Sequence, residues 1–200
     1  MSALSDAEGE QIVKAARAGV EAEASDRGAP EVTLPPAMDE KRGVFVTLNI
    51  GKQLRGCIGI VLPYYKASEA LRIAAEDVCH DPRFPPLKPD ETDRCTVEVS
   101  VLTVPEKIEY SSTDDLQSQI NIGEDGLVLY YKRSARVTNN AVFLPQVPVE
   151  QGWDTEQYLS ELCAKAGLQD SAWRSGVIEF YKFSAEVFGE ETPNGKVKRV

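Results

Sequence analysis

A thiol, a guanidinium and two glycines stand within one short apolar segment, Leu54–Gly59. The thiolate is the reactive form of cysteine, and a nearby cation lowers the pKa of a thiol. Arg55 precedes Cys57 by two positions, so on a strand we expect both side chains on the same face. Gly56 and Gly59 leave room for a ligand to approach the backbone. The segment is therefore our first candidate site, with Cys57 as nucleophile and Arg55 as its activating cation.

The same residues also allow a purely structural interpretation. A free cysteine is most often a small buried apolar residue, and glycines in a hairpin often mark a β-bulge. A cysteine nucleophile usually needs a base. His80 is the only histidine of the chain and stands next to Asp81. At the end of a predicted helix we expect it to be a surface residue stabilised by the helix dipole. The choice between a catalytic and a structural Cys57 stays open.

Other polar residues can complete the site. Asp81–Pro86 is a stiff, proline-rich loop that presents Arg83, which could converge with Arg55 on a carboxylate or phosphate or could pair with a local carboxylate. Glu98 stands on the polar side of a predicted strand, as a general base or a solvated residue. The residues that we expect to bind the ligand are Gly56, Gly59, Asp81, Arg83, Ser100, Gln146 and Glu150.

Metal and cofactor motifs give little signal. Cys79 and His80 are the only adjacent pair of metal-ligand type, and the sequence has no phosphate-binding loop, dinucleotide fingerprint or H-E-x-x-H motif. We therefore expect no metal and no common cofactor. The cysteines are dispersed without a C-x-x-C pair, which favours reduced thiols. Three of them, Cys79, Cys95 and Cys163, lie on apolar faces and are expected to be buried.

The charge balance restricts the partners. Acidic residues outnumber basic ones by 32 to 22, which gives a net charge of -10. Such a surface repels phosphate backbones, so nucleic-acid and anionic-membrane binding are disfavoured. No segment approaches the ~20 consecutive apolar residues of a membrane span. The acidic first ten residues do not resemble a secretory signal. We expect a cytoplasmic protein.

The candidate site is expected to lie in a hairpin. Strand Gly43–Ile50 leads into a Gly51-Lys52 turn and a return strand over Leu54–Val61, which Pro63 ends. A third strand over Cys95–Val104 alternates apolar and polar residues.

Three segments have the apolar spacing of helices. The first begins with a capping box at Ser5, the second with Ser68 and the third with Asp154. The second ends at Asp81-Pro82, because a residue before proline leaves the helical region, and the third ends at Gly167.

The second half of the chain repeats this mixture of elements. Ile120–Ile122 and Leu127–Tyr131 flank a turn, residues 132–140 read as a polar loop, and Val177–Phe188 reads as one long aromatic-rich strand. Residues 189–200 are expected to be a loose polar tail. Hairpins and helices without regular alternation indicate an α+β fold with a mixed, largely antiparallel sheet flanked by helices. We expect a single domain over residues 1–200, of one body or two closely packed lobes.

Eight blocks spread over the chain resemble the AMMECR1 domain family, of the archaeal type, in order and spacing. In chain order they are Gly43–Leu48 (GVFVTL), Leu54–Gly59 (LRGCIG), Asp81–Pro86 (DPRFPP), Glu98–Leu102 (EVSVL), Gly123–Leu127 (GEDGL), Phe143–Val147 (FLPQV), Glu150–Trp153 (EQGW) and Lys165–Leu168 (KAGL).

The resemblance implies an α+β fold of two unequal lobes around a cleft, with the LRGCIG block at a functional surface. It also implies an association with Memo-like or radical-SAM proteins, because such domains occur beside or fused to them. Two functions follow as hypotheses. One is an enzyme acting on a small or anionic substrate, or a peptide, in that cleft. The other is a binding or partner module without chemistry of its own that uses the same cleft.

Overall fold

The computed structural model describes residues 4–28, 30–134 and 137–200. The chain divides into two compact units, which we treat separately. Unit 1 consists of Met1–Val104 and Glu186–Val200, and unit 2 consists of Pro105–Ala185. In the described ranges, no helix has both the length and the apolar character needed to cross a membrane.

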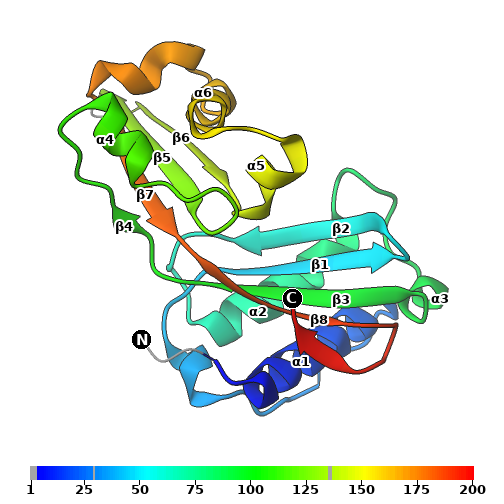
Figure 1. Cartoon of the computed structure of the whole chain (residues 1–200). Helices are drawn as coiled ribbons and strands as arrows, with labels where there is room; N and C mark the ends of the chain where they lie inside the picture. Colours follow the sequence, from blue (N-terminus) through cyan, green and yellow to red (C-terminus); the bar gives the residue numbers. More distant parts are fainter. Residues whose placement is uncertain (1–3, 29, 135–136) are drawn as a thin grey trace. The chain divides into compact units, whose positions relative to one another are not determined.

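Unit 1 combines helices with a five-stranded sheet of order β2-β1-β3-β8-β9 (Figure 1). Its elements are α1 (Asp6–Ala24), η1 (Pro36–Asp39), β1 (Val44–Ile50), β2 (Gln53–Ile60), α2 (Ala67–Asp77), η2 (Val78–His80), α3 (Pro89–Thr92), β3 (Cys95–Leu102), β8 (Ala185–Glu190) and β9 (Val197–Arg199). Strand β1 pairs antiparallel with both β2 and β3, and β8 pairs antiparallel with β9. This arrangement makes β2 an edge strand of the sheet.

The hairpin of β1 and β2 has the predicted position but an irregular register. Gly51 turns the chain with a φ of 60°, which glycine adopts without strain. Leu48 pairs with Gly56 and Asn49 pairs with Leu54, so Arg55 is the additional residue of a β-bulge. The strict alternation of faces along β2 is therefore interrupted at Arg55.

One face of the sheet forms the core of unit 1. Helices α1 and α2 lie along this face (Figure 1). The apolar residues that alternate along β1 and β3 pack there against the apolar stripes of the two helices. Fully buried members include Val44, Val46, Leu48, Val97, Val99, Ile12, Ala16 and Ala74. The residues that alternate with them, such as Thr47 and Glu98, belong to the opposite face and are only partly buried.

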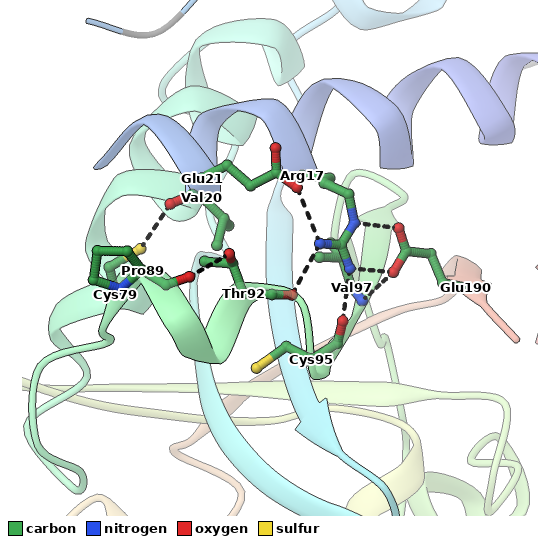
Figure 2. A network of polar contacts seen from close by, with 9 residues as sticks. All are labelled: Arg17, Val20, Glu21, Cys79, Pro89, Thr92, Cys95, Val97 and Glu190. Carbon is green, nitrogen blue, oxygen red and sulfur yellow. Dashed lines mark hydrogen bonds and ion pairs between the residues drawn. The ribbon is translucent and has the colours of Figure 1, made fainter. Parts of the chain in front are cut away.

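A buried ion pair connects α1 to β8 (Figure 2). Arg17 donates hydrogen bonds to both carboxylate oxygens of Glu190, and the two side chains are 8% and 4% exposed. The guanidinium also donates to the backbone carbonyls of Thr92 and Cys95, at 3.2 and 2.7 Å. Glu190 accepts a further bond from the backbone N–H of Val97 at 3.0 Å. A buried charge is tolerated only with such partners, so this network holds α1, α3, β3 and β8 together.

Unit 2 has a four-stranded sheet of order β4-β7-β5-β6, in which every pairing is antiparallel. Its elements are β4 (Glu106–Lys107), α4 (Thr113–Ser118), β5 (Gly126–Ser134), β6 (Val137–Phe143), α5 (Gln146–Gln151), α6 (Thr155–Lys165), η3 (Asp170–Ser175) and β7 (Glu179–Phe183). The core is aromatic, with Tyr158, Trp173 and Phe180 among its fully buried residues.

The expected α+β fold with largely antiparallel sheets is confirmed in both units. Two helix starts are confirmed by capping boxes at Ser5 and Asp154. The second predicted helix begins at Ala67 with Lys66 at the N-cap position, so the prediction of Ser68 as its N-cap residue is wrong. Burial of Cys79, Cys95 and Cys163 is also confirmed.

The single strand predicted over Val177–Phe188 is wrong. The structure divides it into β7 and β8, which belong to the sheets of different units. Both halves have strand composition, and a composition pattern does not report which sheet a strand joins. The loose tail predicted over residues 189–200 is also wrong, because Val197–Arg199 forms β9 against β8.

Two local predictions in unit 2 need correction. Ile120–Ile122 is not a strand, since its residues lie in consecutive turns after α4. Of the polar loop predicted over 132–140, residues 135–136 lie outside the described residues, and the others continue the β5–β6 hairpin, in which Tyr131 pairs with Asn139 and Lys132 with Thr138. Residues 132–140 contain few apolar residues, so the sequence shows no strand alternation there.

Candidate functional site

Cys57 belongs to a row of three polar side chains that crosses unit 1's sheet. In the strand register Cys57 of β2 pairs with Thr47 of β1, and Thr47 pairs with Glu98 of β3. Residues paired across antiparallel strands have their side chains on the same face. The hydroxyl of Thr47 donates a hydrogen bond to Sγ of Cys57 at 3.2 Å. A thiol, a hydroxyl and a carboxylate therefore lie next to one another on the face opposite the core.

The backbone of Cys57 is held from the other side by the Asp81–Pro86 loop. Its N–H donates to Oδ2 of Asp81 at 2.9 Å, and its carbonyl accepts from Nη2 of Arg83 at 3.0 Å. Asp81 and Arg83 also pair with each other, with Nη2 and Oδ2 separated by 2.6 Å. The Asp81 side chain is 1% exposed, whereas that of Arg83 is 55% exposed.

Arg55 holds the far part of the same loop. Its Nε and Nη2 each donate to one carboxylate oxygen of Glu91 at 2.9 Å. Nη2 also donates to the carbonyls of Pro85 and Pro86, at 3.0 and 3.4 Å. A two-bond arginine–carboxylate contact fixes both the position and the plane of the guanidinium. Arg55 therefore fastens the loop to β2.

Each of the two arginines has a carboxylate partner of its own, and their convergence on an anionic ligand stays a prediction. Each guanidinium lies near the ring of Phe84, at 5.9 Å from its centroid for Arg55 and 5.7 Å for Arg83. Arg55 is neutralised by Glu91 and Arg83 by Asp81. Both positive charges are thus already compensated within unit 1.

The thiol of Cys57 is not activated in this arrangement. Burial raises its pKa, and the carboxylates of Asp81 and Glu98 raise it further. The hydrogen bond from Thr47 and the charge of Arg83 act in the opposite direction. Arg83, rather than the predicted Arg55, is the cation that favours the thiolate. Because the raising effects prevail, the thiol is protonated at neutral pH.

The two carboxylates of the loop stay charged over a wide pH range. The guanidinium of Arg83 lowers the pKa of Asp81 to about 2, and that of Arg55 lowers the pKa of Glu91 to about 2. Charge-assisted hydrogen bonds to a carboxylate favour its ionised form. Both ion pairs are therefore intact at every pH at which the thiol can ionise.

The glycines of the LRGCIG block lie against protein atoms. A Cβ added to Gly59 would lie 2.4 Å from the carbonyl oxygen of Val44 and 2.6 Å from Cα of Phe45. A Cβ at Gly56 would lie 3.0 Å from the carbonyl oxygen of Val78. Close approach of neighbouring backbone thus explains both glycines, and their role in ligand binding stays a prediction.

The other predicted residues are placed as follows. Ser100 is buried at 4% exposure and pairs in register with Phe45, one row beyond Thr47. Gln146 and Glu150 lie exposed on α5 in unit 2, so their part in a common site stays a prediction. His80 is exposed, as expected, and its Nε2 lies 2.8 Å from Oε1 of Glu23.

Two residues of this site escaped the sequence interpretation. Thr47 looked like an ordinary strand residue, although the predicted hairpin places it near Cys57. Glu91 lies in the four-residue helix α3 and had no local signal. Within the residues that the structure describes, no three His, Cys, Asp or Glu side chains gather as metal ligands do.

Comparison with known proteins gives one consistent result. The AMMECR1 family model matches residues 13–188 of the chain. Protein PH0010 of Pyrococcus horikoshii is 43% identical over 204 residues, covering 98% of this chain and 96% of that protein. A protein of Thermofilum pendens is 41% identical over 210 residues, covering 98% and 96%. Protein MJ0810 of Methanocaldococcus jannaschii is 42% identical over 200 residues, covering 98% and 97%.

A solved structure agrees with these matches. The crystal structure of the uncharacterized protein PH0010 from Pyrococcus horikoshii superposes with a TM-score of 0.88 at 42% identity. The superposition covers 98% of each chain.

Proposed function

This chain belongs to the AMMECR1 family, and we propose that it is an enzyme in which Cys57 attacks a small, uncharged electrophile. The observation that carries the proposal is the row of Cys57, Thr47 and Glu98, in which the Thr47 hydroxyl donates to the sulfur at 3.2 Å. A nucleophile, a donor for its developing charge and a carboxylate base are the parts that thiol chemistry needs.

The protonated state of the Cys57 thiol determines when its proton is transferred in the reaction. Since burial raises the pKa of Cys57, the proton must leave as the sulfur attacks. Glu98 lies on the far side of Thr47 from Cys57, so in this proposal the Thr47 hydroxyl takes the proton of the thiol and passes its own proton to Glu98. The new bond joins sulfur to the electrophilic carbon, the bond from that carbon to the leaving group breaks, and the proton on Glu98 passes to the leaving group.

The substrate in this proposal is uncharged. The expectation of an anionic ligand rested on Arg55 and Arg83, and each is neutralised by its own carboxylate. The charge of Glu98, next to Thr47 in the same row, further disfavours an anion. Of the small or anionic substrate expected from the sequence, we therefore propose a small one without a negative charge.

A binding module is the second candidate. The raised pKa of Cys57 and the anchoring of its backbone favour a thiol that packs and does not react. A cleft between two lobes, a Memo-like or radical-SAM partner, and a cytoplasmic location remain predictions under either function.

Alkylation with two reagents of different charge tests the proposal. We expect iodoacetamide to label Cys57 in preference to iodoacetate, by a larger ratio in the folded protein than in the unfolded protein. Peptide mass spectrometry measures both rates, with Cys79, Cys95 and Cys163 as internal references. A preference for iodoacetate would restore the anionic substrate. Labelling of Cys57 only after unfolding would contradict the enzyme hypothesis and favour the binding module.

The pH profile of the same alkylation tests the row itself. Because the charge of Glu98 raises the pKa of Cys57, Glu98→Gln is expected to move the profile to lower pH. Because the Thr47 hydroxyl lowers it, Thr47→Val is expected to move the profile to higher pH. Two shifts in the same direction, or none, would contradict the effects assigned to Glu98 and Thr47.

A further inference from the structure

At Cys57, the edge of the sheet in unit 1 is hydrogen-bonded to side chains and not to a neighbouring strand. β2 is an edge strand, and such strands leave a row of outward N–H and C=O groups without a neighbouring strand. At Cys57 both outward groups are occupied, the N–H by Asp81 and the C=O by Arg83. The two partners come from one short loop and are joined in an ion pair.

The pair has the hydrogen-bonding pattern of one strand residue. A neighbouring strand would offer one acceptor and one donor to Cys57, and here a carboxylate oxygen and a guanidinium N–H take these places. The acceptor is fixed by three further bonds, because Oδ1 of Asp81 accepts from the N–H and Nε of Arg83 at 3.0 Å each and Oδ2 accepts from its Nη2. Arg55 adds a second attachment of the loop at Pro85.

We propose that Asp81 and Arg83 are positioning residues that hold the peptide groups of Cys57 and thereby the thiol, in place of the ligand-binding role expected for them. The proposal rests on the proposed function, since it assigns the role of these residues in the chemistry of Cys57. Neither side chain needs to touch the substrate, because each acts through the backbone and the charge that surrounds the sulfur.

The charges of the pair act on the thiol with opposite signs. The groups that face Cys57 are Asp81 and Arg83 from the loop, Glu98 from β3 and the uncharged Thr47 from β1. Arg83 lowers the pKa of the thiol and Asp81 raises it. The intact pair thus fixes the backbone while its two charges act on the sulfur with opposite signs.

Single substitutions in the pair therefore have opposite consequences. Arg83→Gln is expected to move the alkylation profile of Cys57 to higher pH, and Asp81→Asn to lower pH. Arg83→Lys restores the charge and is expected to return the profile towards that of the wild type. A merely structural role would loosen the site in both variants and move reactivity in one direction.

The control is Arg72→Gln. Arg72 is 54% exposed, close to the 55% of Arg83, and pairs with Glu76 on α2. This variant changes the net charge equally, and we expect no shift of the Cys57 profile. A shift of the same size would assign the effect to net charge and overturn the proposal.

Hydrogen exchange of the Cys57 amide separates this proposal from the proposed function. In Asp81→Asn we expect that amide to exchange about tenfold faster, because a charge-assisted hydrogen bond becomes a neutral one. If wild-type Cys57 resists alkylation until unfolding, the enzyme proposal fails, and the exchange rate still tests the positioning. Unchanged exchange in Asp81→Asn would overturn the positioning role even with a reactive thiol.

Discussion

Arg17→Ala is expected to lower the free energy of unfolding of unit 1 by about 3–5 kcal/mol, the usual cost of removing one partner of a buried ion pair. The substitution leaves the carboxylate of Glu190, which is 4% exposed, without its cation. It also leaves the carbonyls of Thr92 and Cys95 without the hydrogen bonds that Arg17 donates. An unpaired buried charge costs far more than the side-chain contacts that are lost with it.

Urea denaturation followed by circular dichroism measures this effect. Both tryptophans, Trp153 and Trp173, lie in unit 2, so their fluorescence reports the other unit in the same sample. Lys14→Ala is the control, because Lys14 pairs with Glu10 on the same helix but the two side chains are 67% and 50% exposed. We expect a cost below about 1 kcal/mol there. Equal costs for the two variants would contradict a buried network.

Gly59→Ala is expected to cost about 3 kcal/mol or more, at the upper end of overpacking effects. The added Cβ would meet the carbonyl oxygen of Val44 and Cα of Phe45, at 2.4 and 2.6 Å. Backbone atoms of the paired strand cannot rotate aside as a side chain can, so the β1–β2 hairpin would have to separate locally. Cys57 lies in the same strand and would move with it.

The matched control is Gly28→Ala, where an added Cβ has no atom within 4 Å. We expect a change within about 0.5 kcal/mol, as for an ordinary surface substitution. The same urea titration measures both variants. A stable Gly59→Ala protein would mean that the space beside this glycine is open, which would support the ligand-binding role predicted for Gly59 from the sequence.

The sequence predicted the elements around the site better than the contacts within it. The hairpin was readable because Gly51 gives a turn between two apolar strands, and α1 because Ser5 gives a capping box. Such signals are local. The bulge at Arg55 has no local signal, because it depends on how two strands pair. It interrupts the simple alternation that had placed the side chain of Arg55 on the same face as that of Cys57.

Ion pairs between residues distant in the sequence were the second kind of feature that the sequence did not predict. Arg17 stands on an apolar helix face, and nothing nearby in the sequence indicates that its partner is Glu190, 173 positions away. Arg83 was recognised as an exposed arginine of a stiff loop, but its bond to the carbonyl of Cys57 depends on the fold. The pair of Arg55 with Glu91 and the contacts of Asp81 and Arg83 with Cys57 join residues distant in the sequence, and no local pattern encodes them.

The division of β7 and β8 between two sheets also affects the order in which the two units can be completed as the protein is synthesised. Unit 2 is one continuous segment, whereas unit 1 is interrupted by it and resumes only at Glu186. On the ribosome, unit 2 is therefore complete before β8 exists. Until Glu190 emerges, Arg17 has no carboxylate from β8 to pair with, and the face of α1 that carries it cannot be buried without cost. A nascent unit 1 therefore lacks β8 and the carboxylate of Glu190 until all of unit 2 has been translated.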